Sequence, residues 1–277
     1  MSTINCNGKL LDLSVPRIMG ILNITTDSFY DGNRYRTDKQ ILDRVGQMLE
    51  EGADIIDIGA VSTRPGALIM NEEEEKNKLI PILKLLLSHF PDIIISVDTY
   101  RAGVAIKSIE EGASIVNDIS GGGIDNSMFE AIISMNCPYI LSHIKGIPEN
   151  MQKDPMYDNI IKEMILYFSE KIKILREGGV KDIIIDPGLG FGKTIHNNYE
   201  IIKKMKYIDI FNLPILIGIS RKSMLYKLLD ITPSEALNAT TVLNTLCLVS
   251  GAKILRVHDV KEANQAIKIT QFIENIH

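Results

Sequence analysis

Residues 51–59 read Glu-Gly-Ala-Asp-Ile-Ile-Asp-Ile-Gly, and residues 111–118 repeat the pattern as Glu-Gly-Ala-Ser-Ile-Val-Asn-Asp. In both segments a glycine precedes a short apolar run, as expected where a helix ends in a left-handed residue and a strand begins. A polar residue lies five positions after the glycine, at Asp57 and Asn117, and Arg256 has the same spacing from a third such glycine. The repeat predicts βα units whose strands place a polar side chain at the same height.

Eight short runs rich in Ile, Leu and Val recur along the chain, and segments of helical length separate them. The runs are continuously apolar rather than alternating, which is typical of parallel strands covered on both faces. Asn71 and the acidic residues 72–75 predict a capped helix start. The predicted strands are Ile18–Leu22, Ile55–Ile58, Ile93–Val97, Ile115–Val116, Tyr139–Leu141, Ile183–Ile185, Ile215–Ile219 and Ile254–Val257.

Alternating β and α elements without a flexible linker leave two architectures, an open doubly wound sheet and a closed barrel. Eight strands favour the barrel, and so do connections that are long after the strands and short before them. A length of 277 residues fits one such barrel. We predict a single (β/α)8 TIM-barrel domain over residues 1–277, with its active site at the carboxyl ends of the strands.

The composition predicts a globular protein, with 45% apolar and 23% charged residues. A net charge of −5 without a basic run argues against nucleic acid or a membrane surface as a partner. No apolar stretch is long enough to span a bilayer, and no secretory signal is evident. The cysteines Cys6, Cys137 and Cys247 lie far apart, which argues against a disulfide scaffold. These features predict a cytoplasmic protein.

Polar residues end nearly every predicted strand. Any one of them is commonly a helix cap or a turn residue, but a barrel would gather all of them on one rim. They are Asn23, Asp57, Asp98, Asn117, His143, Asp186, Lys222, Arg256 and His258.

Two sub-sites follow from the charges of these residues. One set combines acceptors, donors and one cation, which suits the edge of a flat heterocycle such as a pterin or a purine. It comprises Asp98, Asn117, Asp186 and Lys222. The other set is cationic or rich in donors, which suits phosphate or pyrophosphate. It comprises Asn23, Arg64, Arg256 and His258.

Residues 186–194 end in Gly-Lys-Thr, as a phosphate-binding loop does. A P-loop needs a further glycine where Pro187 stands, so ATP or NAD is not expected here. The glycines instead let the backbone approach a flat ligand, with Phe191 against it. Lys222 is open to two interpretations, a Schiff-base nucleophile or a charged ligand contact.

A dedicated zinc site is not expected, because His143 and His258 lack the spacing of zinc ligands. Mg²⁺ carried by pyrophosphate needs only one or two protein oxygens, and the side chain of Asn23 would supply one.

Taken together, these motifs resemble the dihydropteroate synthases of folate biosynthesis over nearly the whole chain. The resemblance implies a barrel that forms a homodimer, needs Mg²⁺ and is the target of sulfonamides. It also implies the joining of 6-hydroxymethyl-7,8-dihydropterin diphosphate to 4-aminobenzoate with release of pyrophosphate. The matching segments are residues 19–29, 57–66, 96–99, 117–119, 186–193, 220–224 and 256–260.

The resemblance assigns roles by position. Asn23 would meet the metal, Arg256 and His258 the diphosphate, and Thr63 and Arg64 would close over both substrates. Pterin binding would fall to Asp98, Asn117, Asp186 and Lys222. Three further residues would line the substrate site, Phe191 and Ser220 beside the aminobenzoate, and Gly218. Catalysis would rest on Arg64, Lys222, Arg256 and His258 through positioning and charge stabilisation, without a strong base.

Five positions depart from the family pattern: Thr26 replaces Pro, Ala60 and Val61 replace Gly and Glu, and Ser142 and Ile144 replace two Met residues. We expect an active enzyme with altered substrate affinity. Two alternatives stay open at this point. One is a pterin-binding methyltransferase barrel, which has no use for a diphosphate cluster. The other is a degenerate barrel that binds pterin without turnover.

A predicted helix over residues 236–250 bears on oligomerisation, because it has no charged face. Its apolar residues predict one buried side, and the residues opposite predict a second covered side, hence a homodimer. A merely polar surface helix is the alternative. The first side comprises Ala239, Val242, Leu243, Leu246 and Cys247, and the second Thr241, Thr245 and Leu248.

Overall fold

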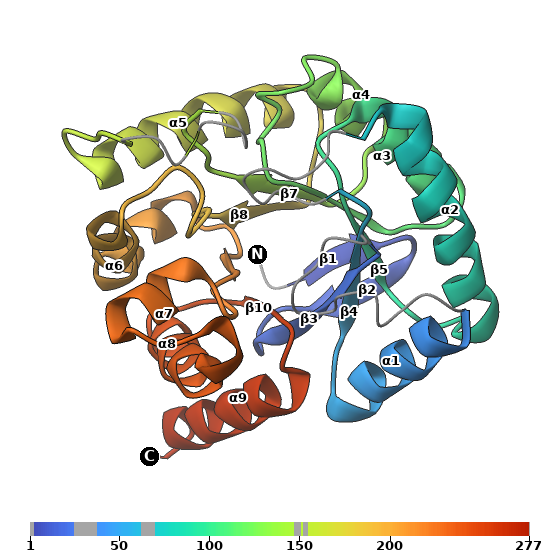
Figure 1. The fold of residues 1–277 in the computed structure, drawn as a ribbon. Helices are drawn as coiled ribbons and strands as arrows, with labels where there is room; N and C mark the ends of the chain where they lie inside the picture. The colour runs from blue at the N-terminus through green and yellow to red at the C-terminus, as the bar shows by residue number, and fades with distance from the viewer. Residues whose placement is uncertain (1–2, 25–37, 62–69, 147–150, 152–154, 277) are drawn as a thin grey trace.

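Eight parallel strands form the centre of the molecule, and helices surround them (Figure 1). The structure is a computed structural model that describes residues 3–24, 38–61, 70–146, 151 and 155–276. The strands hydrogen-bond in the order β8-β7-β6-β5-β4-β3-β10-β9. A parallel bridge between Ile185 of β8 and Ile215, which precedes β9, joins the two ends of the sheet. The predicted (β/α)8 TIM barrel is confirmed.

All eight predicted strands are present, and most bounds agree within one or two residues. The side chains of β4 and β6 to β8 are buried along their whole length, as expected of parallel strands covered on both faces. The strands are β3 (Arg17–Asn23), β4 (Ile55–Gly59), β5 (Ile95–Asp98), β6 (Ile115–Asp118), β7 (Tyr139–Ser142), β8 (Ile183–Asp186), β9 (Leu216–Ile217) and β10 (Ile254–Val257).

The helices begin and end where local chemistry requires. Asn71 accepts a hydrogen bond from the backbone of Glu74, which confirms the predicted cap, and the side chain of Glu74 completes a capping box. Gly52 and Gly112 have φ of 105° and 107° and stop the helices before β4 and β6. The helices are α1 (Asp38–Glu51), α2 (Glu72–His89), α3 (Ala102–Glu110), α4 (Met128–Met135), α5 (Ile160–Glu177), α6 (Ile195–Lys203), α7 (Ser223–Leu229), α8 (Leu237–Val249) and α9 (Val260–Glu274), with 3-10 turns η1 (Met205–Phe211) and η2 (Pro233–Glu235).

A two-stranded hairpin at the N-terminus was not predicted from the sequence. Strand β1 (Thr3–Cys6) pairs antiparallel with β2 (Lys9–Asp12) through a turn at Asn7 and Gly8, both with positive φ. The buried side chains of the hairpin pack against the amino-terminal layer of the barrel interior. The hairpin therefore closes the end of the barrel opposite to the carboxyl ends of its strands.

Helix α8 lies as predicted, but the prediction of its buried face was wrong. Thr240, Leu243, Asn244, Cys247 and Leu248 are buried, so two polar residues belong to the covered side. The outer side exposes Val242, Leu246 and Val249 instead of a polar surface. Apolar residues occur on every side of this helix, so periodicity alone did not locate the core face. No helix in the described part of the chain is long and apolar enough to cross a membrane.

Candidate active site

Two layers of side chains fill the interior of the barrel. The layer next to the hairpin is apolar and fully buried, and its strand residues are Met19, Ile55, Ile115, Ile140, Ile184, Leu216 and Ile254. Successive side chains of a strand alternate in direction, so the residue two positions later faces the same way. That step leads to Ile21, Asp57, Asn117, Ser142, Asp186, Gly218 and Arg256. Two positions along most strands thus lead from an apolar floor to a polar layer, with Ile21 of β3 as the apolar exception.

Arg256 is held at the centre of this polar layer by two carboxylates. Its Nε lies 2.6 Å from Oδ2 of Asp57, and its Nη2 lies 2.6 Å from Oδ2 of Asp98. The amide of Asn117 donates to the same oxygen of Asp57 at 3.0 Å. Three residues at matching glycine spacings, on β4, β6 and β10, therefore form one hydrogen-bonded cluster.

Asp57 is a site residue to which sequence reasoning gave no role. It is fully buried, and its Oδ1 has no hydrogen-bond partner in the described residues. A buried carboxylate is unfavourable unless it is paired, and here both Arg256 and Asn117 pair with it. The shared spacing after Gly52, Gly112 and Gly251 did predict Asp57 at the same height as the other two, but it did not indicate that the three would pair.

Two causes determine the pKa values in this cluster: the groups are buried, and two carboxylates share one guanidinium. Burial raises the pKa of Asp98 to about 7 against the attraction of Arg256, and the nearby Asp57 raises it further. The pKa of Arg256 is raised above its ordinary value because Asp57 and Asp98 outweigh its burial. Arg256 is therefore a permanent cation, whereas Asp98 changes charge near neutral pH.

Lys222 enters the site from the loop after β9. Its ammonium donates to the carbonyl of Leu189 at 2.5 Å and lies 4.3 Å from the centre of the Phe191 ring. Burial lowers its pKa to about 8, whereas the negative charge of Asp186 raises it. Asp186 and Arg256 both act on the Lys222 ammonium, so Asp186 and Lys222 lie at the same end of the barrel as Arg256, as the sequence predicted.

Lys193 holds the loop after β8 in place. It is the lysine of the Gly-Lys-Thr sequence at residues 192–194. Its ammonium is buried and donates to the carbonyl oxygens of His143, Gly188 and Phe191 at 2.8–3.0 Å. Burial lowers the pKa of Lys193 to about 7. The lysine therefore holds the loop backbone, which places Phe191 against Lys222.

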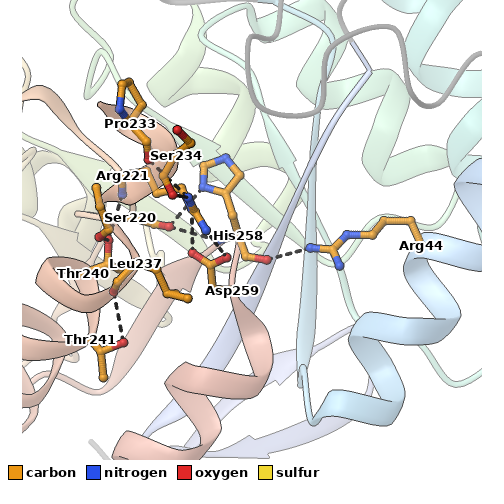
Figure 2. Close-up of polar contacts among 11 residues, drawn as sticks. Arg44, Ser220, Arg221, Pro233, Ser234, Leu237, Thr240, Thr241, His258 and Asp259 are labelled. Carbon is orange, nitrogen blue, oxygen red and sulfur yellow. Dashed lines mark hydrogen bonds and ion pairs between the residues drawn. The ribbon is translucent and has the colours of Figure 1, made fainter. Parts of the chain in front are cut away.

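The sequence analysis placed His258 in the cationic set, and the structure corrects this prediction. Burial lowers its pKa to about 3, and the neighbouring guanidinium of Arg256 lowers it further. The ring is therefore neutral at pH 7. Its Nδ1 lies 3.1 Å from the hydroxyl of Ser220, which places Ser220 beside the histidine (Figure 2).

The remaining predicted residues have different positions. Asn23 ends β3 and pairs with Gly59, which in turn pairs with Asp98, so it lies on the same rim. Its side chain makes no hydrogen bond to another described residue. Thr63 and Arg64 lie outside the described residues, as does Thr26. Gly218 is buried in the polar layer, where its lack of a side chain leaves space beside Arg256 and Lys222.

The described residues do not form a metal site by themselves. They contain no group of three or more His, Cys, Asp or Glu side chains suited to a metal ion. Two neighbouring carboxylates, Asp57 and Asp98, are engaged by Arg256. The amide oxygen of Asn23 fits a Mg²⁺ ion that receives most of its oxygens from a substrate phosphate and water.

The sequence was compared with protein families and with curated proteins, and both comparisons identify the family of this chain. Residues 19–258 match the family model described as pterin binding enzyme. The dihydropteroate synthase of Escherichia coli K12 is 39% identical over 266 residues, which cover 95% of this chain and 94% of that protein. The dihydropteroate synthase of Clostridium beijerinckii is 40% identical over 259 residues, with 92% and 93% covered. The chain belongs to the dihydropteroate synthase family.

Solved structures of dihydropteroate synthases share the fold closely. That of Yersinia pestis, crystallised with a sulfonamide drug, has a TM-score of 0.95 at 37% identity and covers 99% of this chain and 100% of that one. That of Xanthomonas albilineans with 4-aminobenzoic acid has a TM-score of 0.91 at 31% identity, with 100% and 99% covered. The chain is thus an enzyme of the transferase class with the function of a dihydropteroate synthase.

Proposed function

We propose that this chain is a single pterin-binding domain that joins 6-hydroxymethyl-7,8-dihydropterin diphosphate to 4-aminobenzoate and releases pyrophosphate. The observation that carries this proposal is the polar layer directly above the apolar floor. It offers acceptors, donors and cations around one opening, and a glycine at position 218 leaves room for a flat ring. Family membership makes the same substrates the expected ones.

The pterin ring would be read by the deepest polar residues. Asp186 would accept hydrogen bonds from the ring N–H and the exocyclic amino group, and Asn117 and Lys222 would donate to ring nitrogen and carbonyl oxygen. Asp98 would accept from a further N–H group in its ionised form. Phe191 would lie beside the aminobenzoate.

The diphosphate would lie against Arg256 and His258 at the rim. Arg256 uses Nε and Nη2 for its carboxylates, and its Nη1 has no hydrogen bond to another described residue, so Nη1 would donate to the diphosphate. Thr63 and Arg64 would complete the anion site. Asn23 would contribute a ligand to Mg²⁺, which when bound supplies positive charge beside the departing diphosphate.

The proposed reaction breaks the bond between the pterin methylene carbon and the diphosphate oxygen, and the oxygen keeps the electron pair. The positive charge left on the methylene carbon is spread over the pterin ring. The amine nitrogen of 4-aminobenzoate then forms the new C–N bond and loses a proton to solvent. Positioning of two substrates and stabilisation of the leaving anion supply the rate enhancement.

Pyrophosphate release, measured with and without 4-aminobenzoate, tests this function. We expect release that depends on the arylamine, with sulfonamides competing against 4-aminobenzoate. Lys222→Ala should weaken pterin binding, and Arg256→Ala should weaken binding of the diphosphate substrate. A folded protein without arylamine-dependent release would contradict the proposal.

A homodimer through α7, α8 and α9 is part of the proposal. These neighbouring helices expose apolar side chains, which a monomer rarely leaves in contact with water over a large area. They include Leu228, Leu229, Val242, Leu246, Val249, Ile269 and Phe272. Light scattering at micromolar concentration should give twice the chain mass, and Leu246→Lys should reduce it to one.

A cytoplasmic location is also proposed. Cys6, Cys137 and Cys247 are buried free thiols, which suits a reducing compartment. Trapping of all three as free thiols in protein taken directly from cells would support this location, and oxidised cysteines would contradict it.

A further inference from the structure

Two loops at the mouth of the barrel pair residue by residue. Ser220 contacts His258, and the next residue of each loop, Arg221 and Asp259, form an ion pair (Figure 2). Nε and Nη2 of Arg221 each lie 2.9 Å from a carboxylate oxygen of Asp259, so the pair is bidentate. Both side chains of the ion pair are largely buried. The pair therefore holds Ser220 and His258, the preceding residues of the two loops, next to each other.

Further bonds anchor both loops. Arg221 adopts a positive φ of 53°, and its Nη1 donates to the carbonyl oxygens of Pro233 and Ser234. On the other loop, Arg44 of α1 donates to the carbonyl oxygen of His258 at 2.6 Å (Figure 2). A strained backbone persists only where its surroundings hold it. The relative position of the two loops is therefore set before any ligand binds.

The hydrogen atoms between Ser220 and His258 can be assigned by counting acceptors. The backbone N–H of His258 donates to the Ser220 hydroxyl oxygen at 3.2 Å. The hydroxyl is buried, and its other contact within the described residues is Nδ1 of His258 at 3.1 Å. If Nδ1 carried a proton, the buried hydroxyl hydrogen would have no acceptor there, which is unfavourable. The hydroxyl therefore donates to Nδ1, and the ring proton is on Nε2.

Burial is the main reason that the ring is neutral, and the charged groups around it act in the same direction. The positive groups are the guanidinium groups of Arg256, Arg221 and Arg44, and the negative group is the carboxylate of Asp259. That carboxylate is already paired with Arg221, so the cations prevail. A neutral imidazole with one fixed N–H has one donor and one acceptor edge.

We propose that Ser220 is a positioning residue that fixes His258 as the neutral Nε2–H tautomer, so that the ring binds the departing diphosphate as a hydrogen-bond donor and not as a cation. This inference rests on the proposed function for the identity of the anion. It assigns Ser220 to the leaving-group side of the reaction, whereas the family resemblance places it beside the aminobenzoate.

The tautomer is measured in the resting full-length protein, without substrate. Long-range 1H–15N spectra of 15N-labelled protein distinguish protonated from unprotonated ring nitrogens, and the His258 signals are assigned by their loss in His258→Asn. We expect a protonated Nε2 and an unprotonated Nδ1. Ser220→Ala should give a mixture of tautomers, and Ser220→Thr, which keeps the hydroxyl, should restore the original pattern.

The matched control is Thr241→Ala, which removes a nearby hydroxyl bonded to Leu237 of its own helix (Figure 2). It should leave the His258 signals unchanged. A protonated Nδ1 in the unmodified protein, or a spectrum that Ser220→Ala does not alter, would overturn the proposal.

Steady-state kinetics test the role of the tautomer. Ser220→Ala should raise KM for the pterin diphosphate about tenfold, as expected for one hydrogen bond to a charged group, and leave KM for 4-aminobenzoate unchanged. His258→Gln, whose amide nitrogen replaces Nε2, should retain more activity than His258→Asn, whose amide nitrogen replaces Nδ1.

A rise in KM for 4-aminobenzoate alone, or greater activity of His258→Asn, would overturn the assignment of Ser220. Failure of the proposed function is distinguishable, because it would remove arylamine-dependent pyrophosphate release from the unmodified protein. The spectra need no substrate and would still decide the tautomer.

Discussion

The two layers inside the barrel have the same backbone geometry and opposite chemistry. In the lower layer, Ile55 and Ile184 pack against the hairpin and exclude water. Two positions later, Asp57 and Asp186 are buried in the next layer, nearer the carboxyl ends of the strands. The comparison teaches that fold stability and ligand recognition are carried by adjacent layers of the same strands, so substitutions two positions apart should have different consequences.

The largest expected effect comes from Arg256→Gln in the upper layer. It leaves Asp57 and Asp98 without their cation, so kcat/KM should fall more than about 100-fold and the free energy of unfolding should fall by about 3 kcal/mol. Pyrophosphate release and urea unfolding measure the two quantities.

The matched control is Arg17→Gln at the amino end of β3, the strand next to β10, where Arg17 pairs with Asp54 at 3.0 Å. These side chains are partly exposed, so the free energy of unfolding should change by about 1 kcal/mol or less, with no loss of activity. Equal losses of activity in the two variants would remove the distinction between the ends of the barrel.

A pair of substitutions on β8 separates the layers within one strand. Ile184→Ala creates a cavity in the floor and should lower the free energy of unfolding by about 3 kcal/mol, with KM unchanged in the folded enzyme. Asp186→Asn should instead raise KM for the pterin substrate about tenfold. Urea unfolding and KM are measured on both variants. A rise in KM for Ile184→Ala, with a loss of stability alone for Asp186→Asn, would contradict the separation of the two layers.

The pH dependence of pterin binding should be a narrow optimum between about pH 7 and pH 8. Below it Asp98 is protonated and loses its acceptor role, and above it Lys222 loses the proton that it donates. KM for the pterin diphosphate should rise up to about tenfold per pH unit outside the optimum. Asp98→Asn should remove the acid limb and Lys222→Arg the alkaline limb, and limbs that persist would refute the assignment.

Stability should respond in the opposite direction to binding. The pKa of Asp98 is higher in the folded state than the ordinary 3.8, so folding retains a proton and stability falls as pH rises from about 4 to 7. The pKa of Lys222 is lower than the ordinary 10.5, so the unfolded state binds more protons and stability rises between about pH 8 and 10.5. Unfolding measured across pH, with the two variants above as controls, checks both signs.

The smallest expected effect is that of Gly218→Ala. The added carbon would lie 3.8 Å from Arg256 Cβ and 3.9 Å from Lys222 Nζ, so the substitution fits without displacement. The free energy of unfolding should stay within about 0.5 kcal/mol, while KM for the pterin should rise several-fold because space for the ring is lost. An unchanged KM would show that this space is not used by the substrate.

Much of the fold followed from the sequence, because parallel strands buried on both faces leave continuous apolar runs that polar turns separate. The hairpin was missed although Asn7-Gly8 between short strands is a strong hairpin signal. Its strands have four residues each, and only Ile4, Cys6 and Leu11 show the alternation.

The residues of the site could be predicted, but their pairings could not. Asp98, Asn117, Asp186, Lys222 and Arg256 meet at one end of the barrel, as their positions at strand ends indicate. Their roles toward substrates stay predictions.

The neutral charge of His258 and the importance of Asp57 depend on contacts made at long range. The ion pair of Asp57 with Arg256 spans 199 positions, and guanidinium groups from separate elements surround His258. The glycine spacing places Asp57, Asn117 and Arg256 at one height, but no local pattern of residues encodes which side chains pair.

The N-terminal hairpin has a consequence for how the chain reaches its native state. Residues 3–13 are synthesised before Ile254 of the last strand, although Ile4, Leu11 and Ile254 belong to the same apolar cluster. These side chains therefore lack part of their apolar surroundings until the last strand has been made, and exposed apolar surface of this kind favours aggregation of an incomplete chain.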